Sequence, residues 1–307
     1  MEMQTFEEVL FLRLKDALKR LAPSGILLSG GIDSGLLACL SPKLRAVTVR
    51  LGDQAKDSRY LVILKERLEI EVETVEVTLE DALRALPDVV RILRSFDPAL
   101  PNDLTVYFGL KAFSEMGIGR VITGDGGDEL FGGYDYMVRI EDLEAYQQEL
   151  LPHLYFSSSK IGEALGVKVL QPYLEPEVVE FALQLPRDWK IREAEGRLWG
   201  KWILRKALER YLPPEFAWQD KRPLEVGSGM TALRERIAQG ISDSEFEEKS
   251  RRYGINFLCK EHLYFYEIYR EVVGEIPKPR PGEVACPHCG AGKPPNRGHC
   301  RVCGMKG

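Results

Sequence analysis

The stretch LLSGGIDSG, residues 27–35, decides the fold. It follows the short apolar run GILLS and leads into a helical pattern that begins near Asp33. Ligands of doubly wound sheets gather where strands end, and adjacent glycines let the backbone approach such a ligand closely. Free N–H groups at a helix start attract anions, and the hydroxyls of Ser29 and Ser34 add further donors. The stretch therefore predicts a loop that holds a phosphate chain.

The segments on either side predict a parallel sheet covered by helices. Short apolar runs, expected to be strands, alternate with helical periodicities, the first of which follows a T-x-x-E capping box at Thr5 and Glu8. That rhythm is typical of an α/β fold with a doubly wound parallel sheet. We expect strands near 25–29, 44–51, 71–77 and 120–124, helices at 6–21, from about 33 and at 58–68, and two more helices before 116. Residues 139–273 predict a mainly helical half.

A second glycine loop, RVITGDGGDELFGGYDY at 120–136, repeats the device after another expected strand. It carries the acids Asp125, Asp128 and Glu129. Carboxylates beside a polyphosphate repel it unless a cation lies between them, so the composition favours Mg²⁺ bridging Asp33, Asp128 and the leaving pyrophosphate. The alternative for each loop is an ordinary glycine turn with solvated acids.

The usual nucleotide motifs, G-x-x-x-x-G-K-[ST] and G-x-G-x-x-G, do not occur in the sequence. The pattern S-G-G-x-D-S instead resembles the signature of the PP-loop ATP pyrophosphatases, also described as adenine nucleotide α-hydrolase-like. With TGDGGDELFGGY, and with the segments 166–186 and 201–229, the chain resembles the synthetase domain of asparagine synthetases and their relatives, including β-lactam synthetases. The signature positions are Ser29, Gly30, Gly31, Asp33 and Ser34.

This resemblance implies an ATP-dependent, AMP-forming amide synthetase or amidotransferase. The loop would grip the β and γ phosphates, which leave as pyrophosphate, while a carboxylate acceptor is adenylated and then opened by ammonia or an amine. In such relatives the residues matching Val49 and Leu51 line the adenine, and those matching Thr123 and Gly124 lie near AMP.

Two catalytic residues are also implied by the resemblance. Lys221 matches a lysine that neutralises charge during adenylation, a task suited to a flexible point charge; the alternative is a solvated surface lysine. Asp125 matches an acid with a role at the adenylated intermediate, where a carboxylate could accept a proton from the attacking amine. Glutamate also occurs at this position, and the shorter aspartate weakens that assignment.

The nitrogen donor is where the sequence departs from the glutamine-dependent members. These carry an N-terminal glutaminase domain whose nucleophilic cysteine follows the initiator methionine, whereas the first cysteine here is Cys39. We therefore expect nitrogen from free ammonia, from a separate glutaminase chain or from an amine on the acceptor.

The tail carries two C-x-x-C-G knuckles, a strong signature of a closed tetrahedral Zn²⁺ site that would supply folding energy. A disulfide pair or bound iron is the alternative. The proline-rich segment 277–283 reads as a linker, so the expected division is an ATP pyrophosphatase domain at 1–276 and a zinc ribbon at 284–307. The expected ligands are Cys286, Cys289, Cys300 and Cys303, with His288 and His299 as bystanders.

Charge separates the tail from the rest of the chain. Residues from 277 onward carry a formal +5, so the remainder carries −10 of the net −5. A basic ribbon raises an alternative in which the enzyme adenylates a tRNA base and the ribbon docks the RNA. Without an apolar run of about 18 residues or a signal peptide pattern, we expect a cytoplasmic protein that does not enter membranes.

Overall fold

The structure is a computed structural model that describes residues 5–306. Its centre is a five-stranded, wholly parallel sheet with the strand order β3-β2-β1-β4-β5. This confirms the predicted doubly wound α/β class. The strands are β1 (Gly25–Leu27), β2 (Arg45–Leu51), β3 (Val72–Val77), β4 (Arg120–Ile122) and β5 (Lys168–Leu170).

The fifth strand, β5, lies inside the half of the chain that the sequence predicted to be mainly helical. It pairs with β4, Arg120 opposite Lys168 and Ile122 opposite Leu170. Three residues are too few to show a strand periodicity, and the preceding helix masks them. The hairpin of β6 (Ile191–Ala194) and β7 (Arg197–Gly200) was missed as well.

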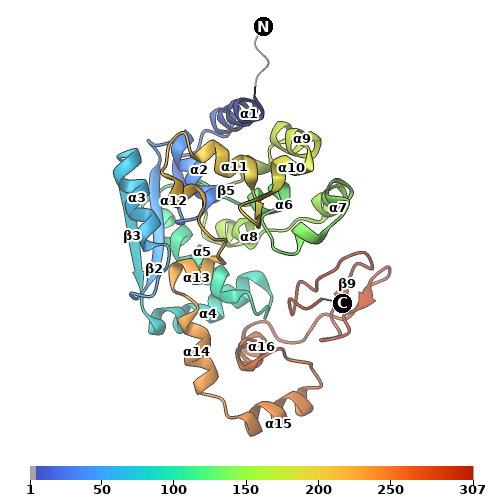
Figure 1. Cartoon of the computed structure of the whole chain (residues 1–307). Coiled ribbons are helices and arrows are strands. Elements are labelled where there is room, and N and C mark those ends of the chain that lie inside the picture. Colours follow the sequence, from blue (N-terminus) through green and yellow to red (C-terminus); the bar gives the residue numbers. More distant parts are fainter. Residues whose placement is uncertain (1–4, 307) are drawn as a thin grey trace.

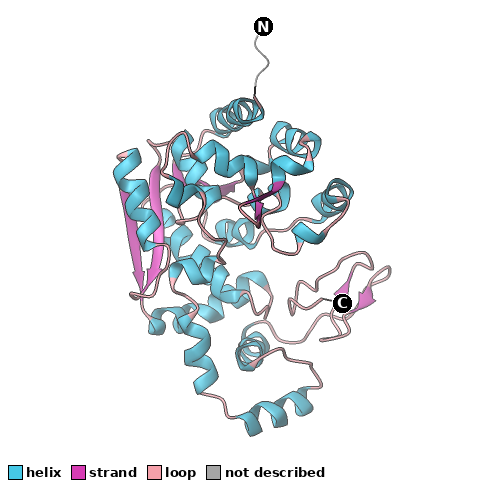
Figure 2. Ribbon diagram, in the orientation of Figure 1, coloured by secondary structure: helices cyan, strands magenta, loops and turns pink. Residues whose placement is uncertain are grey.

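Helices cover both faces of the sheet (Figure 2). Those of the N-terminal half are α1 (Phe6–Leu21), α2 (Ile32–Leu40), α3 (Ser58–Leu68), α4 (Leu79–Leu93), α5 (Leu100–Glu115), α6 (Gly127–Phe131), α7 (Leu143–Leu150) and α8 (Ser157–Ala164). Those of the C-terminal half are α9 (Pro176–Gln184), α10 (Arg187–Lys190), α11 (Trp202–Leu208), α12 (Pro214–Ala217), α13 (Leu224–Ser228), α14 (Ala232–Gln239), α15 (Asp243–Tyr253) and α16 (Lys260–Val272). Short 3₁₀ helices span Met137–Arg139, Leu151–His153 and Pro172–Leu174.

Each face of the sheet has its own apolar core, because successive strand side chains point to opposite sides. Ile26 and Leu28 join the core formed with α1, α2 and α11, whereas Leu27 packs against the core on the other face. Val47 and Val49 of β2 also enter that second core, with α4, α5 and α16. Helix α1 begins at the predicted capping box, where the Thr5 side chain accepts from the backbone N–H of Glu8.

The cysteine ribbon lies beside α16 and below α7, on the side of the molecule away from β3 (Figure 1). Its small hairpin pairs β8 (Val284–Ala285) with β9 (Gly292–Lys293). The cysteines lie in the same core as Phe96 and α16. The backbone N–H of Phe96 donates to the carbonyl of Val302 at 2.8 Å, and the side-chain Oγ of Ser95 donates to the same carbonyl at 3.1 Å. The ribbon is therefore held to the body by backbone bonds as well as by apolar contact.

Candidate active site

The two glycine loops meet because the strands that precede them are neighbours. Gly25 of β1 pairs with Val121 of β4, and both strands point the same way, so their carboxyl ends lie at one edge of the sheet. Each loop then starts a helix, which places Asp33 in the first turn of α2 and Asp128 in the first turn of α6. Both carboxylates thus lie where the strand order changes direction, which is the usual ligand site of such sheets.

Glycines allow the two loops to touch. A Cβ on Gly124 would lie 2.9 Å from Cβ of Asp33, and a Cβ on Gly127 would overlap the Asp33 carboxylate. A side chain at either position would force the loops apart. Gly124 and Gly127 are therefore explained by close packing of the second loop against the first loop.

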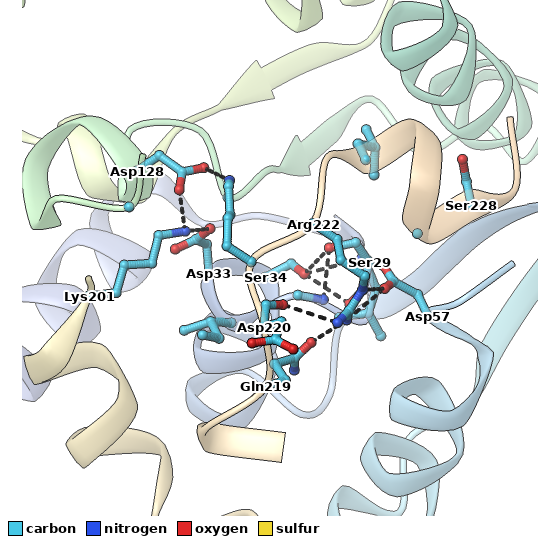
Figure 3. Close-up of a pocket in the computed structure, with 18 of the residues that line it drawn as sticks. Ser29, Asp33, Ser34, Asp57, Asp128, Lys201, Gln219, Asp220, Arg222 and Ser228 are labelled. Atoms are coloured by element: carbon cyan, nitrogen blue, oxygen red, sulfur yellow. Dashed lines mark hydrogen bonds and ion pairs between the residues drawn. The ribbon is translucent and has the colours of Figure 1, made fainter. Parts of the chain in front are cut away.

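Four charged side chains form the centre of the site (Figure 3). Nζ of Lys201 lies 2.5 Å from Oδ2 of Asp33 and 2.7 Å from Oδ1 of Asp128, and the Lys201 side chain is only 4% exposed. Lys221 pairs with the other Asp128 oxygen from a more exposed position. The structure thus brings together Asp33, Asp128 and Lys221, as the sequence predicted, and adds Lys201.

Burial and charge act in opposite directions on these groups. Burial would raise the pKa of Asp128, but the ammonium groups of Lys201 and Lys221 outweigh it and lower that pKa to about 2. For Asp33 burial prevails over the attraction of Lys201, so its pKa is raised. Burial alone would lower the pKa of Lys201, yet the carboxylates of Asp128 and Asp33 raise it above its ordinary value. Asp128 is therefore the more firmly ionised of the two acids.

The carboxylates fit a bound divalent cation. Among the described residues, Oδ1 of Asp33 is buried without a hydrogen-bond partner, and Oδ1 of Asp128 has only the ion pair with Lys201. Unpaired buried oxygens are costly unless a ligand satisfies them. Two hard oxygen donors next to a phosphate site are what Mg²⁺ prefers.

The first loop forms hydrogen bonds within itself on the cavity side and to Asp57 on the opposite side. Oγ atoms of Ser29 and Ser34 lie 2.9 Å apart, and the Gly31 N–H donates to Oγ of Ser29 at 3.1 Å. The Gly30 N–H instead donates to Asp57 at 3.2 Å, on the side of the loop where α3 begins. Hence Ser29, Gly31 and Ser34 face the cavity, whereas Gly30 serves close packing.

A large cavity extends from the charged centre along β2. Among the residues predicted for the nucleotide, Val49, Thr123 and Gly124 line it. Leu51 lies outside its lining, with its carbonyl against Gly229. Other lining residues that the sequence did not nominate include Thr105, Val106, Tyr134, Ser158, Arg197, Trp199 and Ser228.

Asp125, the predicted base, lines the same cavity but is strongly bonded. Its Oδ2 accepts from Thr123 Oγ1 at 2.7 Å, Ser158 Oγ at 2.5 Å and Gln171 Nε2 at 3.1 Å. Three donors fix the direction of this carboxylate. Because all three hydrogen bonds end on Oδ2, a proton from the attacking nitrogen would have to be accepted by Oδ1. Its role as a base stays a prediction.

The sequence argument also missed Lys201, Asp57 and Arg222. Lys201 adopts a left-handed backbone conformation just before α11, with φ of 57°, and its sequence neighbours are Gly200 and Trp202. A lysine in such an apolar, glycine-flanked context is a detectable signal, since lysine is rarely buried without a partner. For Asp57 and Arg222 the sequence holds no comparable signal.

The tail places its four cysteine sulfurs within 4.8 Å of one another. Cys286 and Cys303 are 3.7 Å apart, and Cys289 and Cys300 are 3.8 Å apart. One thiolate from each of four positions at these separations suits a single tetrahedral metal. His288 stays outside this group, with its Nε2 against the Lys306 carbonyl at 2.8 Å.

Two tail cations lie over tyrosines of the body. The Arg301 guanidinium lies 4.3 Å from the ring centre of Tyr155, and the Lys306 ammonium lies 6.0 Å from that of Tyr136. The aromatic run of α16 is likewise occupied, since His262, Phe265 and other members of this helix are buried in the core. These aromatic side chains therefore pack the helix against the body.

A parallel sheet with an S-G-G-x-D-S loop at its switch point defines an α/β domain of the PP-loop type. The chain belongs to the asparagine synthase family, whose model matches residues 6–155 and 143–263.

The chain is 27% identical to asparagine synthetase B [glutamine-hydrolyzing] of Escherichia coli (strain K12), over 86% of this chain and 52% of the relative. It is 26% identical to a probable asparagine synthetase [glutamine-hydrolyzing] of Dictyostelium discoideum, over 82% of this chain and 52% of the relative. For the nodule asparagine synthetase of Pisum sativum the identity is 27%, covering 84% and 49%. The chain thus spans about half the length of these curated relatives.

None of the described helices is long and apolar enough to cross a bilayer.

Proposed function

We propose that this protein is an ATP-dependent, AMP-forming carbon–nitrogen ligase that adenylates a carboxylate before nitrogen attacks it. The observation that carries the proposal is the convergence of Asp33, Asp128, Lys201 and Lys221 beside the first glycine loop. Two carboxylates and two ammonium groups in one cluster suit a group that gains and loses negative charge, as a leaving pyrophosphate does. Membership of the asparagine synthase family supports the same reaction class.

The reaction balances as two displacements. An acceptor carboxylate oxygen attacks the α-phosphorus of ATP, the bond from that phosphorus to the bridging oxygen breaks, and pyrophosphate leaves. Ammonia or an amine then attacks the acyl carbon, AMP leaves with the carboxylate's oxygen, and the nitrogen loses a proton. Asp125, which lines the cavity beside Ser158, is the candidate to accept that proton.

In this scheme the chain's own residues bind and orient the triphosphate. Lys221 stabilises charge on the leaving phosphates, and Ser29 and Ser34 exchange their mutual hydrogen bonds for bonds to phosphate oxygens. Asp33 and Asp128 would hold Mg²⁺, which supplies charge neutralisation to the triphosphate. Val49, Thr123 and Gly124 line the cavity where the adenosine end would lie. We place Leu51 behind that wall rather than in it.

The four cysteines would hold one Zn²⁺ in a structural role. Closed Cys₄ sites have no open coordination position, and this one lies in the core shared with Phe96 and α16. The metal therefore would stabilise the ribbon and its seat on the body rather than take part in the chemistry.

An ATP–pyrophosphate exchange assay tests the function without knowledge of the nitrogen donor. Purified protein with Mg²⁺ is screened against aspartate, other amino acids and total tRNA, and nucleotide products are identified. Exchange that requires a carboxylate, with AMP as product after ammonia is added, supports the proposal. ADP as the product excludes it. Exchange that requires tRNA instead supports the alternative acceptor class, for which the contacts of Arg301 and Lys306 with body tyrosines offer no support.

A further inference from the structure

Asp57 is the residue through which three segments meet behind the first glycine loop. It directly precedes α3 and is 8% exposed. Its Oδ2 accepts from the Gly30 N–H at 3.2 Å, and its own N–H donates to the Gly227 carbonyl at 3.0 Å. Asp57 thus joins the phosphate loop, the start of α3 and the end of α13.

Two glycines make room for this aspartate. A Cβ on Gly30 would lie 2.8 Å from Cβ of Asp57 and 2.9 Å from its carbonyl oxygen. A Cβ on Gly227 would overlap the Asp57 carboxylate. Neither approach is possible for a residue with a side chain, so Asp57 is enclosed from both sides by a backbone that fits only glycine.

Arg222 reaches the same carboxylate from the loop that carries Lys221. Its Nε and one terminal nitrogen lie 3.2 Å and 3.0 Å from Oδ1 of Asp57, and its guanidinium lies 4.6 Å from the ring centre of Tyr60. The same terminal nitrogen donates to Oε1 of Gln219 at 2.5 Å. A guanidinium with two partners and an aromatic ring has little freedom to move.

Gln219 closes the network on the phosphate loop itself. Its Nε2 donates to the Gly30 carbonyl and to the Phe216 carbonyl, both at 3.0 Å. Gly30 is thereby bonded through its N–H to Asp57 and through its carbonyl to Gln219. Figure 3 shows these side chains together on the side of the loop away from Asp128 and Lys201.

The network matters because the Lys221 ammonium is held by Asp128 and lies over the Tyr134 ring, whereas its backbone belongs to a segment without regular structure. Residues 219–223 form neither helix nor strand, and the Lys221 side chain is 33% exposed. Its sequence neighbours Gln219 and Arg222 are bonded to Gly30 and Asp57. The network therefore ties the chain on either side of Lys221 to the first glycine loop, while Asp128 holds the ammonium itself.

We propose that Asp57, Arg222 and Gln219 act as positioning residues, a clasp that fixes the distance between the phosphate loop and Lys221. The inference rests on the proposed function, since it assigns the clasp to the grip on the leaving pyrophosphate. The clasp residues act through Gly30 and Lys221 and do not themselves react. A displacement of about 1 Å in such a group can lower a rate by about 10²-fold.

The test uses Arg222→Lys, which keeps the charge but loses the two-pronged bond to Asp57. We expect the ATP–pyrophosphate exchange rate to fall about 10- to 100-fold. In a Lys221→Ala background the same substitution should lower it by less than twofold, because the group to be positioned is gone. A merely structural role would lower the rate equally in both backgrounds, which overturns the proposal.

Arg234→Lys is the matched control. Arg234 also pairs with a carboxylate through Nε and a terminal nitrogen, which bond to separate oxygens of Glu225 at 2.9 and 3.1 Å. We expect it to keep the wild-type exchange rate, and an equal loss in Arg234→Lys and Arg222→Lys contradicts the clasp.

Calorimetric titration with ATP and Mg²⁺ separates this inference from the proposed function. Asp57→Asn should bind ATP at least several-fold more weakly than wild type. If wild type does not bind ATP, the proposed function fails; if wild type binds and Asp57→Asn binds equally well, only the clasp fails. Arg222→Lys carries the same comparison if Asp57→Asn does not fold.

Discussion

Lys201 and Asp33, 168 residues apart in the chain, form a buried ion pair in the described site, with Nζ 2.5 Å from Oδ2. The same ammonium lies 2.7 Å from Asp128, between the two carboxylates that we assign to Mg²⁺. Lys201 and the cation would thus neutralise the same pair of acids. Removing the lysine should make the protein depend on the metal for stability.

Lys201→Met tests this dependence. The substitution removes the ammonium and leaves the buried carboxylates of Asp33 and Asp128 facing each other. Loss of one partner of a buried ion pair lowers stability by on the order of 3–5 kcal/mol. We expect urea unfolding without divalent cations to show a loss of this size. Millimolar Mg²⁺ should recover a substantial part of it in the variant and have a much smaller effect on wild type. Equal effects of Mg²⁺ on the two proteins would contradict a shared role.

The contact between the two glycine loops can be tested at Gly127. Gly127→Ala places a Cβ on the Asp33 carboxylate, so the loops must separate. We expect the ATP–pyrophosphate exchange rate to fall by about 10²-fold. Gly119→Ala is the control, because a Cβ there meets no described atom within 4 Å. A normal rate in Gly127→Ala would show that the loops tolerate separation.

Asp103 gives a pH-dependent prediction. Burial raises its pKa from 3.8 to about 7, against a hydrogen bond from Ser157. Between pH 4 and 7 the folded state therefore holds a proton that the unfolded state has released, and stability falls as the pH rises through this range. Asp103→Asn should remove that loss, stabilising the protein above pH 7 by up to about 4 kcal/mol, and have little effect near pH 4.

Thermal or urea unfolding at pH 4.5, 6 and 8 measures the Asp103 effect. Asp16→Asn, an exposed position on α1, serves as the control and should shift stability little at any of these pH values. A stabilisation by Asp103→Asn that did not grow with pH would show that the carboxyl is ionised throughout.

The cysteine ribbon should lose its metal when one ligand is replaced. Metal analysis of wild type should give about one Zn²⁺ per chain, and Cys300→Ser should bring it near zero. Because the ribbon bonds to Ser95 and Phe96, the variant should also expose the α4–α5 connection to amide hydrogen exchange. Cys259→Ser, outside the cluster, should keep the metal. Full metal content in Cys300→Ser would reject the four-cysteine assignment.

Much of the N-terminal half followed from local signals. The capping box of α1, the helix at 58–68 and the apolar run of β2 are each written in neighbouring residues, and the glycine loops follow their strands directly. The convergence of Asp33 and Asp128 could be inferred because parallel neighbouring strands bring their ends together. The cysteine spacing likewise predicted the sulfur cluster that the structure shows.

The remainder depended on contacts between distant segments. Strand β5 is only three residues long and, unlike the equally short β1 and β4, is not followed by a glycine loop that marks its end. Arg222 is an ordinary cation in the sequence, and its importance comes from Asp57, the acid that it meets after folding. The seat of the ribbon on Phe96 also could not be predicted, since the proline segment suggested separation.

The enclosure of Asp57 by Gly30 and Gly227 has a consequence for descent. Positions 30, 57 and 227 occupy one shared volume, so a larger residue at any of them can be accepted only with compensation at the others. We expect related sequences to vary at α15, which has no buried residue, and to change little or only together at these three positions. Whether they change in concert can be read from the natural diversity of the family alone.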